Sequence, residues 1–459
     1  MGAIALRAWL MLDYGPAFAG FGDSHEYVTA ALVGVFHDVQ KPAGYPIFLA
    51  LVHLLSDSLA FTIVVQHVLG LATGVLLFAS VRRTGAPAWL GLLPAAVVFF
   101  GGTGVLLEHA LLGDCLFAFL QALGVYACVR ALFEPAWRWP ALAGAAIGAS
   151  FWVKTVGISS AAVTVPLLAL AAPGTRRRRL LSTACAGGVV VVLLVGYIAA
   201  QAAVTGYTGY ERQGAWNLYG RVATFVNCQH FTPPAGTRFL CPSEPLGERQ
   251  SESFYQYARA APAVRRFGGP AHAPAYADAL LERFSVAAIE HEPLSYAGAI
   301  VRALDFYISP RGGEGYTPQT IREALLETKG TRSIQPAISA YYPHDHGYQP
   351  PTHATSALDA LDSYERQTRI QGPLLVALLA LALAGVPALS GRMRAASLLF
   401  TLTALFSVTL AAAGNSYDAR YGYPAFGPLA AAGALGAWAL ARRARARITG
   451  PGPVPDASA

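Results

Sequence analysis

Long apolar stretches alternate with short charged ones along most of the chain, and this alternation predicts a bundle of membrane helices. A helix that crosses the hydrocarbon core needs about 20 mostly apolar residues, with roughly 17 to 25 tolerated. Two of the stretches, 139–153 and 156–172, are short for a span. The predicted spans are residues 59–81, 87–107, 115–133, 139–153, 156–172, 180–204, 373–390, 395–413 and 422–441.

The apolar segment 1–12 is too short to cross a membrane and contains Arg7. We expect it to be the end of a first transmembrane helix whose beginning is missing, the alternative being a partly inserted N-terminal helix. The sequence thus predicts an all-α polytopic membrane protein with about nine or ten transmembrane helices.

Composition agrees, because 54% of the 459 residues are hydrophobic and only 13% are charged, against about 25% charged in soluble domains. The net charge of +7 could indicate a nucleic-acid partner. However, the cationic residues gather beside apolar spans, where they act as topology signals, and we expect no nucleic-acid partner. Richness in Ala and Gly, with only three lysines, suggests a GC-rich bacterial genome.

Five arginine-containing junctions fall on one side when the nine spans are threaded in order, and the positive-inside rule makes that side cytoplasmic. We therefore predict a multi-pass protein of the inner (plasma) membrane whose active site faces outward. The outer side receives residues 13–58, the turn from Glu108 to Asp114, Lys154, the polar segment 205–372 and the turn 414–421.

Four parts of the chain follow from this topology. Residues 1–204 form an N-terminal membrane module that includes the first external loop, 13–58. Residues 205–372 form an external insert, 373–449 the closing helices, and 450–459 a disordered cytoplasmic tail. Cys228 and Cys241 lie in the insert and are permitted to form a disulfide outside the cytoplasm, although sequence does not show their geometry.

The most distinctive polar segment is Gly22-Asp23-Ser24-His25-Glu26-Tyr27 in the first external loop. On a helix, Asp23 and Glu26 share one face and could bracket a proton-transfer site. A carboxylate of this kind could take the proton of an acceptor hydroxyl. The alternative is a helix cap made by Asp23 or Ser24, with Glu26 in the first turn.

Further on, the same loop contains Lys41-Pro42-Ala43-Gly44-Tyr45-Pro46. Lys41 and Tyr45 could contact a phosphate or line an entrance at the membrane surface. They could equally be a snorkelling lysine and an interfacial aromatic residue.

Other polar residues are expected on the same face. Glu108 and Asp114 form a second acidic pair where ionisable groups are costly, although Asp114 could simply cap a helix. Lys154 is a lone cation between two short spans and could bind a lipid phosphate or snorkel. Arg420, followed by Tyr421, suits phosphate because its fork donates two parallel hydrogen bonds; the alternative is a local pair with Asp418.

A histidine-rich patch in the insert, made by His344, Asp345, His346 and His353, could hold a metal, but a Pro-rich loop is a weak scaffold for one. We therefore predict no metal-binding residues. The chain also contains no Walker loop, dinucleotide fingerprint, HExxH or paired CxxC motif.

Taken together, these positions resemble the GT-C superfamily of polytopic glycosyltransferases over roughly residues 5–172 and 373–441. The acidic first loop with a following tyrosine matches Asp23, Glu26 and Tyr27, with His25 between the two carboxylates. A proline-glycine-tyrosine-proline entry matches Pro42 to Pro46, and an acidic second turn matches Glu108 or Asp114. A cation after a small-residue span, here Lys154, looks like the phosphate contact of the protein-mannosyl and lipid A aminoarabinose transferase branch. The Arg-Tyr-x-x-Pro start of a late helix is similar to Arg420, Tyr421 and Pro424.

The resemblance implies an inverting transfer of a hexosyl or pentosyl group from a polyprenyl-phosphate donor to an extracytoplasmic glycan, lipid or protein. Asp23 would be the general base, supported by Glu26 or Asp114, while Lys154 and Arg420 would hold the donor phosphate. Some relatives use a divalent metal, but the sequence singles out no site for one. The sequence departs from the mannosyl branch, whose Asp-Glu pair is here Asp-Ser-His-Glu.

Two rival functions come from other classes. A transporter or lipid flippase would have ionisable residues near the bilayer midplane, whereas the charged residues of this chain are predicted to gather on the outer face. An inert scaffold with a binding insert is the other alternative. The sugar, the acceptor and the oligomeric state cannot be read from the sequence.

Overall fold

Helices make up the structure, as the sequence predicts. Apart from one β-bridge between Phe18 and Ala110, the secondary structure of the described residues is helical. The prediction of an all-α membrane protein is therefore confirmed. The computed structural model describes residues 1–19, 22–309, 328–345, 355–370, 372–415 and 417–448.

Six helical stretches of this part of the chain are long and apolar enough to cross a membrane, so the chain is a multi-pass membrane protein. They contain five of the predicted spans in single helices and a sixth in a stretch running from Asp359 to Ala388. These helices are α4 (Leu59–Arg83), α7 (Asp114–Phe133), α10 (Arg176–Thr205), α19 (Pro373–Gly385) within Asp359–Ala388, α20 (Gly391–Gly414) and α21 (Ala419–Ile448).

The other three predicted spans are also helical but differ in length or shape. The span 87–107 is broken into α5 (Leu92–Phe100) and α6 (Gly102–Glu108), with a bend of 56°. Gly101 lies at the break, where a Cβ would come within 2.5 Å of the Val97 carbonyl oxygen. The remaining two are α8 (Arg138–Val153) and α9 (Ile158–Ala171), which are shorter than the six spanning stretches.

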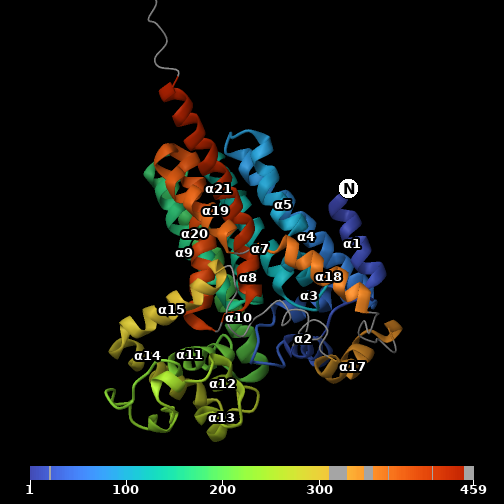
Figure 1. Ribbon diagram of the computed structural model, residues 1–459, viewed down its shortest axis with the longest axis vertical. Coiled ribbons are helices and arrows are strands. Elements are labelled where there is room, and N and C mark those ends of the chain that lie inside the picture. The colour runs from blue at the N-terminus through green and yellow to red at the C-terminus, as the bar shows by residue number, and fades with distance from the viewer. Residues whose placement is uncertain (20–21, 310–327, 346–354, 371, 416, 449–459) are drawn as a thin grey trace, which may run out of the picture.

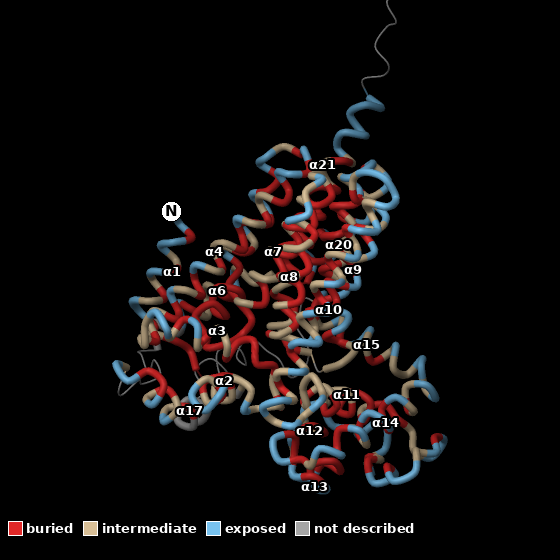
Figure 2. Tube along the Cα trace, turned by 180° about the vertical axis from the view of Figure 1, so that it is seen from behind, coloured by how far each residue is buried: buried red, intermediate tan, exposed pale blue. Residues whose placement is uncertain are grey.

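Small residues let the bundle helices approach each other closely. The buried side of α21 is rich in alanine and glycine, and α19, α20 and α5 pack against it. Within a membrane, such close backbone approach supplies van der Waals contact where the hydrophobic effect between helices is weak. Figure 2 shows this buried interior running along α7, α8, α20 and α21.

One end of the bundle gathers the arginine clusters, and we call it the arginine end. Arg83 at the end of α4 and Arg130 near the end of α7 both pair with Glu134, at 2.6 and 2.7 Å. Arg178, in the first turn of α10, donates to the carbonyl of Pro135. The structure therefore places these arginines at one end of the bundle, as the order of the predicted spans requires. Figure 1 shows the last turns of α21 at the same end.

At the opposite end lie the first loop and the insert. α1 (Gly2–Asp13) leads into α2 (Gly22–Val33) and α3 (Gly44–His53), which lie at the lower end of the bundle in Figure 1. The insert begins after Gly206, which ends α10 with φ 75°, and has its own apolar core around Trp216. Its helices are α11 (Gln213–Ala223), α12 (Glu252–Tyr257), α13 (Pro262–Phe267), α14 (Tyr276–His291) and α15 (Pro293–Ile308).

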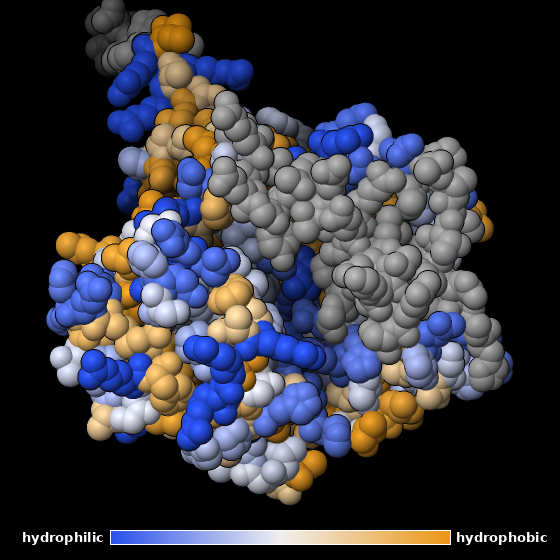
Figure 3. Space-filling view, turned by 60° about the horizontal axis from the view of Figure 1, so that its bottom comes forward, coloured by the Kyte–Doolittle hydropathy of each residue, from blue (hydrophilic) through white to orange (hydrophobic). Residues whose placement is uncertain are grey.

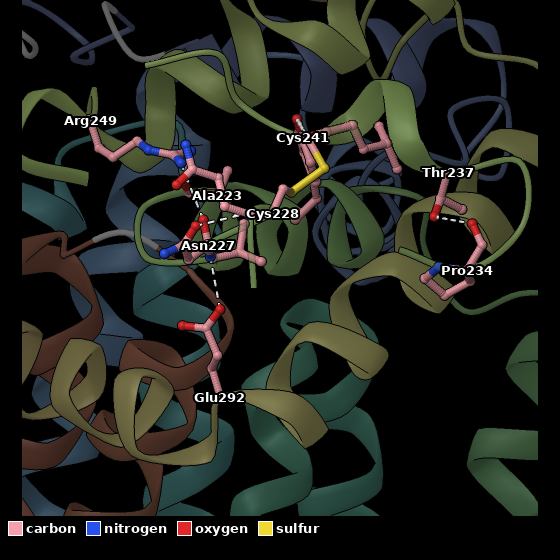
Figure 4. Close-up of a disulfide and its surroundings, with 12 residues drawn as sticks. Ala223, Asn227, Cys228, Pro234, Thr237, Cys241, Arg249 and Glu292 are labelled. Carbon is pink, nitrogen blue, oxygen red and sulfur yellow. Dashed lines mark hydrogen bonds between the residues drawn. A yellow bond between two sulfur atoms is a disulfide. The ribbon is translucent and has the colours of Figure 1, made fainter. Parts of the chain in front are cut away.

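A disulfide joins Cys228 to Cys241 in the insert, with the two Cα atoms 6.1 Å apart, as Figure 4 shows. Beside it, the backbone N–H of Asn227 donates to Glu292 at 2.8 Å, and Arg249 donates to the carbonyl of Ala223. The pairing that the sequence permitted is therefore present. It fixes the loop that follows α11 to the rest of the insert.

The final part of segment 205–372 leaves the insert core and returns to the N-terminal helices. α17 (Thr328–Tyr341) packs on α2, and α18 (Thr355–Thr368) packs on α6. Ile334 and Ile338 of α17 share an apolar cluster with Tyr27. After the insert core, segment 205–372 therefore continues into helices that pack on the N-terminal part of the chain. The predicted tail 450–459 lies outside the described residues.

Candidate active site

Asp23 lies in the first turn of α2 and its carboxylate is held by cations from two distant parts of the chain. Lys41 Nζ lies 2.8 Å from Asp23 Oδ1, and Arg420 Nη1 lies 3.0 Å from Asp23 Oδ2. Lys41 comes from the loop between α2 and α3, whereas Arg420 comes from the first turn of α21. Each oxygen of this one carboxylate thus receives a charge-assisted hydrogen bond, the stronger class of such bonds.

These two cations decide the charge of Asp23. Burial alone would raise the pKa of this carboxyl, but Lys41 and Arg420 outweigh burial and hold the pKa well below its usual range. Burial would likewise lower the pKa of Lys41, and the carboxylates of Asp23 and Glu26 raise it well above its usual value. At neutral pH, Asp23 is therefore an ionised carboxylate matched to two cations.

Glu26 lies one helical turn after Asp23 and behaves differently. Its Oε2 lies 3.8 Å from Lys41 Nζ, and its side chain is 29% exposed. Burial raises its pKa to about 7; Lys41 opposes this rise, and the charges of Asp23 and Asp38 add to it. Two carboxyl groups on one helix face therefore titrate in different pH ranges, which is typical of sites that move protons.

A second ion pair lies beside the first. Lys154, directly after α8, contacts Asp114 at the start of α7, with 2.6 Å between Nζ and Oδ1. The Tyr421 ring links the two pairs, because its centroid is 5.1 Å from Lys154 Nζ and 5.8 Å from Arg420 Cζ. Both cations thus contact the same aromatic ring.

The local pair considered for Arg420 is present as well. Arg420 Nε donates to Asp418 Oδ2 at 2.7 Å, while its Nη1 reaches Asp23. The guanidinium therefore bridges two carboxylates. This fork arrangement also matches the geometry of a phosphate group.

Two predicted aromatic residues serve as packing for this site. Tyr27 and Tyr45 meet edge to face with their ring centroids 5.0 Å apart, and both are buried. The Tyr45 hydroxyl donates to Gln66 at 2.6 Å. The prediction that Tyr45 lines an entrance is therefore wrong, because its ring belongs to the apolar core beneath the loop. His25 is half-buried on α2, between the two carboxylates.

Glu108 is separated from the ion pairs and lies fully buried among the helices. Arg7 of α1 donates to both of its oxygens, at 2.8 and 2.7 Å, and His67 Nδ1 lies 3.0 Å from its Oε2. The prediction that Glu108 stands on the outer face beside Asp114 is corrected by these contacts. Sequence spacing could not reveal the pairing, because Arg7 and Glu108 are 101 residues apart.

The insert adds two residues that the sequence did not single out. Glu211 accepts a hydrogen bond from the hydroxyl of Thr155, the neighbour of Lys154, and burial raises the Glu211 pKa to about 7. Burial likewise raises the pKa of Tyr257, whose hydroxyl accepts a bond from Gln213 at 2.8 Å. Neither residue stands in a motif. The only available signal was an acidic residue soon after the span 180–204.

Among the described residues, no group of three His, Cys, Asp or Glu side chains is arranged to hold a metal. His344 pairs with Asp57 at 2.8 Å, and Asp345 accepts from the backbone N–H of Leu59. His346 and His353 of the predicted patch lie outside the described residues. The carboxylate of Asp23 faces cations, so the residues present do not fit a divalent metal there.

A hollow with a hydrophilic floor opens on the face that carries the insert (Figure 3). Two small pockets near α5, α6, α19 and α21 share Thr103, Ile370 and Phe426 in their lining.

No family model and no curated protein matches this sequence. Among solved structures, the S. cerevisiae protein O-mannosyltransferase Pmt1-Pmt2 complex bound to the sugar donor is 15% identical, with a TM-score of 0.34. That likeness covers 48% of this chain and only 36% of the other. ArnT from Cupriavidus metallidurans bound to undecaprenyl phosphate is 13% identical, with a TM-score of 0.37, covering 99% of this chain and 80% of the other. Its apo state is 14% identical, with a TM-score of 0.36, covering 97% and 77%.

Proposed function

We propose that this chain is a GT-C-type glycosyltransferase that moves a sugar from a polyprenyl-phosphate donor to an extracytoplasmic acceptor. The observation that carries the proposal is the carboxylate of Asp23 held between Lys41 and Arg420. A general base and cations able to hold a phosphate leaving group are the two components that such a transfer needs. They lie at the end of a membrane bundle, where a lipid-linked donor and a water-borne acceptor can meet.

The reaction follows from these charges. The donor phosphate competes with Asp23 for Lys41 and Arg420, and the carboxylate becomes a stronger base as the cations turn toward phosphate. Asp23 accepts the proton of the acceptor hydroxyl, whose oxygen attacks the anomeric carbon. The bond from that carbon to the phosphate oxygen breaks, and the electron pair leaves with the polyprenyl phosphate. Attack opposite the leaving group inverts the anomeric carbon.

The remaining charges have supporting roles in this proposal. Lys154 lies beside Tyr421 and can take a share of the developing phosphate charge once Asp114 releases it. Glu26 can hold or relay the proton taken by Asp23, because its pKa is about 7. The insert and α17 cover the site and restrict which acceptor reaches it.

The outward orientation belongs to the proposal too, and two features support it. The arginine end lies away from the site, as the positive-inside rule requires of a cytoplasmic end. The disulfide between Cys228 and Cys241 lies in the insert, and disulfides persist outside the reducing cytoplasm.

The proposal is tested with purified protein in nanodiscs, a polyprenyl-phosphate sugar labelled on the sugar, and an extract of bacterial membranes as acceptor source. We expect label to move to a non-donor product, with one polyprenyl phosphate released for each sugar transferred. A flippase would leave the donor intact and move it between leaflets of a vesicle. If the donor stays intact in nanodiscs and is moved between leaflets in vesicles, the protein is a flippase and the proposal is wrong.

A further inference from the structure

The loop that carries Lys41 is fastened to the start of the insert. Two backbone bonds join them: Arg212 N–H donates to the Val39 carbonyl at 2.8 Å, and Gln213 N–H donates to the Gln40 carbonyl at 3.3 Å. The side chains add a third bond, from Gln40 Nε2 to Gln213 Oε1 at 2.9 Å, and both glutamines are buried. Gln40 directly precedes Lys41, so these bonds fix the backbone from which the lysine side chain extends.

The segment that carries Arg420 is fastened to the same insert by a different residue. The Arg221 guanidinium donates to the carbonyl of Asn415, and Gln256 Nε2 donates to Asn415 Oδ1 at 3.4 Å. The amide of Asn415 in turn donates to the Tyr421 hydroxyl at 2.8 Å. Asn415 directly follows α20, so the insert holds the turn that leads into α21.

α11 and α12 connect these two attachments through contacts with each other. Gln213 and Arg221 stand near the two ends of α11. Gln213 also donates to the hydroxyl of Tyr257 on α12, and Arg221 pairs with Glu252 of α12. At Gly220 the two helices approach so closely that a Cβ would meet Gln256 at 2.8 Å.

The cations need such support because neither comes from the middle of a membrane helix. Lys41 lies in a loop, and Arg420 lies in a first helical turn that is entered through a short connection. Groups that act on a reacting centre must be held closely, and a displacement of about 1 Å can cost about 100-fold in rate. Buried amide and guanidinium bonds provide this support, since a buried donor left without its partner is costly.

We propose that α11 and α12 form a brace that sets the distance between Lys41 and Arg420, with Gln213 and Arg221 as positioning residues. The inference rests on the proposed function for the meaning of the two cations. It extends that function by giving the insert a task in the transfer step. The insert then holds the phosphate-binding cations from outside the membrane, in addition to covering the site.

Two variants, each with a control that makes the same substitution elsewhere, test the brace. Gln213→Leu removes the buried amide, and its control Gln367→Leu removes an exposed amide that donates within α18, to Ser363 at 3.0 Å. Arg221→Lys keeps a positive charge beside Glu252 but loses the fork to Asn415. Its control, Arg283→Lys, changes an exposed arginine that donates to Ala235 elsewhere in the insert.

The first measurement is hydrogen exchange, which does not depend on any activity. We expect Gln213→Leu to speed exchange in peptides covering 36–45, and Arg221→Lys to speed it in peptides covering 412–423, with both controls unchanged. Unchanged exchange in both peptides would overturn the brace. If Gln213→Leu cannot be recovered folded, Arg221→Lys carries this test alone.

The second measurement is transfer from the polyprenyl-phosphate sugar. We expect Gln213→Leu and Arg221→Lys each to lower kcat/KM for the donor about 10- to 100-fold, measured on protein that remains folded, while both controls keep the wild-type value. Gln40→Leu and Gln213→Leu should be non-additive, because either change breaks the same bond. Wild-type kcat/KM in both variants would overturn the brace, whereas absence of transfer in the wild type would overturn the proposed function and leave the exchange result standing.

Discussion

Lys41 Nζ lies 2.8 Å from Asp23 Oδ1. The lysine that is proposed to bind the donor phosphate therefore also neutralises the carboxylate that is proposed to act as the base. Arg420 repeats the arrangement on the other oxygen at 3.0 Å. The carboxylate and the two cations therefore neutralise one another in this structure. A bound phosphate would break this balance and couple donor binding to the strength of the base.

Replacing Lys41 by methionine should weaken donor binding while leaving the fold intact. A charge-assisted hydrogen bond contributes about 1.5–3 kcal/mol, so the Kd for polyprenyl phosphate should rise about 10- to 100-fold. Lys41→Arg should bind within a few fold of wild type, and the exposed Arg259→Met serves as the control. The measurement is quenching or calorimetric titration in nanodiscs. Equal affinity of Lys41→Met and wild type would remove Lys41 from the phosphate site.

Glu26 should make the protein less stable as pH rises toward 8. Its folded pKa is about 7, above the ordinary glutamate value of 4.5, so the folded state binds more protons than the unfolded state between these two values. The free energy of unfolding therefore falls with rising pH across this window, by about 1–3 kcal/mol after allowance for solvent screening. Glu26→Gln cannot ionise and should lose this dependence.

Thermal unfolding at pH 5 and pH 8 checks the Glu26 prediction. Glu26→Gln should be more stable than wild type at pH 8 and close to it at pH 5, while exposed Glu248→Gln should follow wild type at both. An unaltered pH dependence in Glu26→Gln would show that Glu26 titrates in its ordinary range.

Glu108 should matter for stability and not for the transfer step. Glu108→Gln leaves Arg7 without its charge partner in a buried site, and breaking a buried pair costs about 3–5 kcal/mol. We expect a lower unfolding temperature and an unchanged KM for the donor in the protein that remains folded. A variant of wild-type stability that transfers no sugar would restore Glu108 to the active site.

The disulfide should stabilise the insert. The two cysteines are 13 residues apart, and closing a loop of this size contributes about 3 kcal/mol in the chain-entropy account. Cys228→Ser should therefore lower the unfolding temperature, whereas Cys185→Ser should not. Without reductant, unfolded wild-type protein should react with a thiol reagent at Cys115, Cys128 and Cys185 only. Labelling of all five would mean that the bond is absent.

Sequence patterns predicted what depends on neighbours along the chain. The apolar stretches became helices because helix formation and membrane burial are set within each stretch. The pairing of Asp23 with Glu26 on one face of α2 follows in the same way from helical spacing. For the cations around Asp23, the sequence predicts only that they lie on the same side of the membrane as Asp23, and not that they contact it.

Contacts between distant segments could not be predicted in this manner. The sequence predicts an outer position for Glu108 because nothing near it in the chain indicates its partner, Arg7, which is 101 positions away. Tyr45 is predicted to line an entrance because the chain turns back toward the bilayer at this loop, yet its ring packs in the apolar core beneath α2. The contribution of the insert was missed because Gln213 and Arg221 act through backbone and amide bonds, which no motif encodes.

The most direct test of the account is the transfer rate of Asp23→Asn. The variant is compared with wild type and with Asp305→Asn, an exposed carboxylate of α15, in nanodiscs with labelled polyprenyl-phosphate sugar and membrane extract. Loss of a general base should lower the rate about 10²- to 10⁴-fold, while Asp305→Asn keeps the wild-type rate. Undiminished sugar transfer by Asp23→Asn would contradict the central claim that this carboxylate takes the acceptor proton.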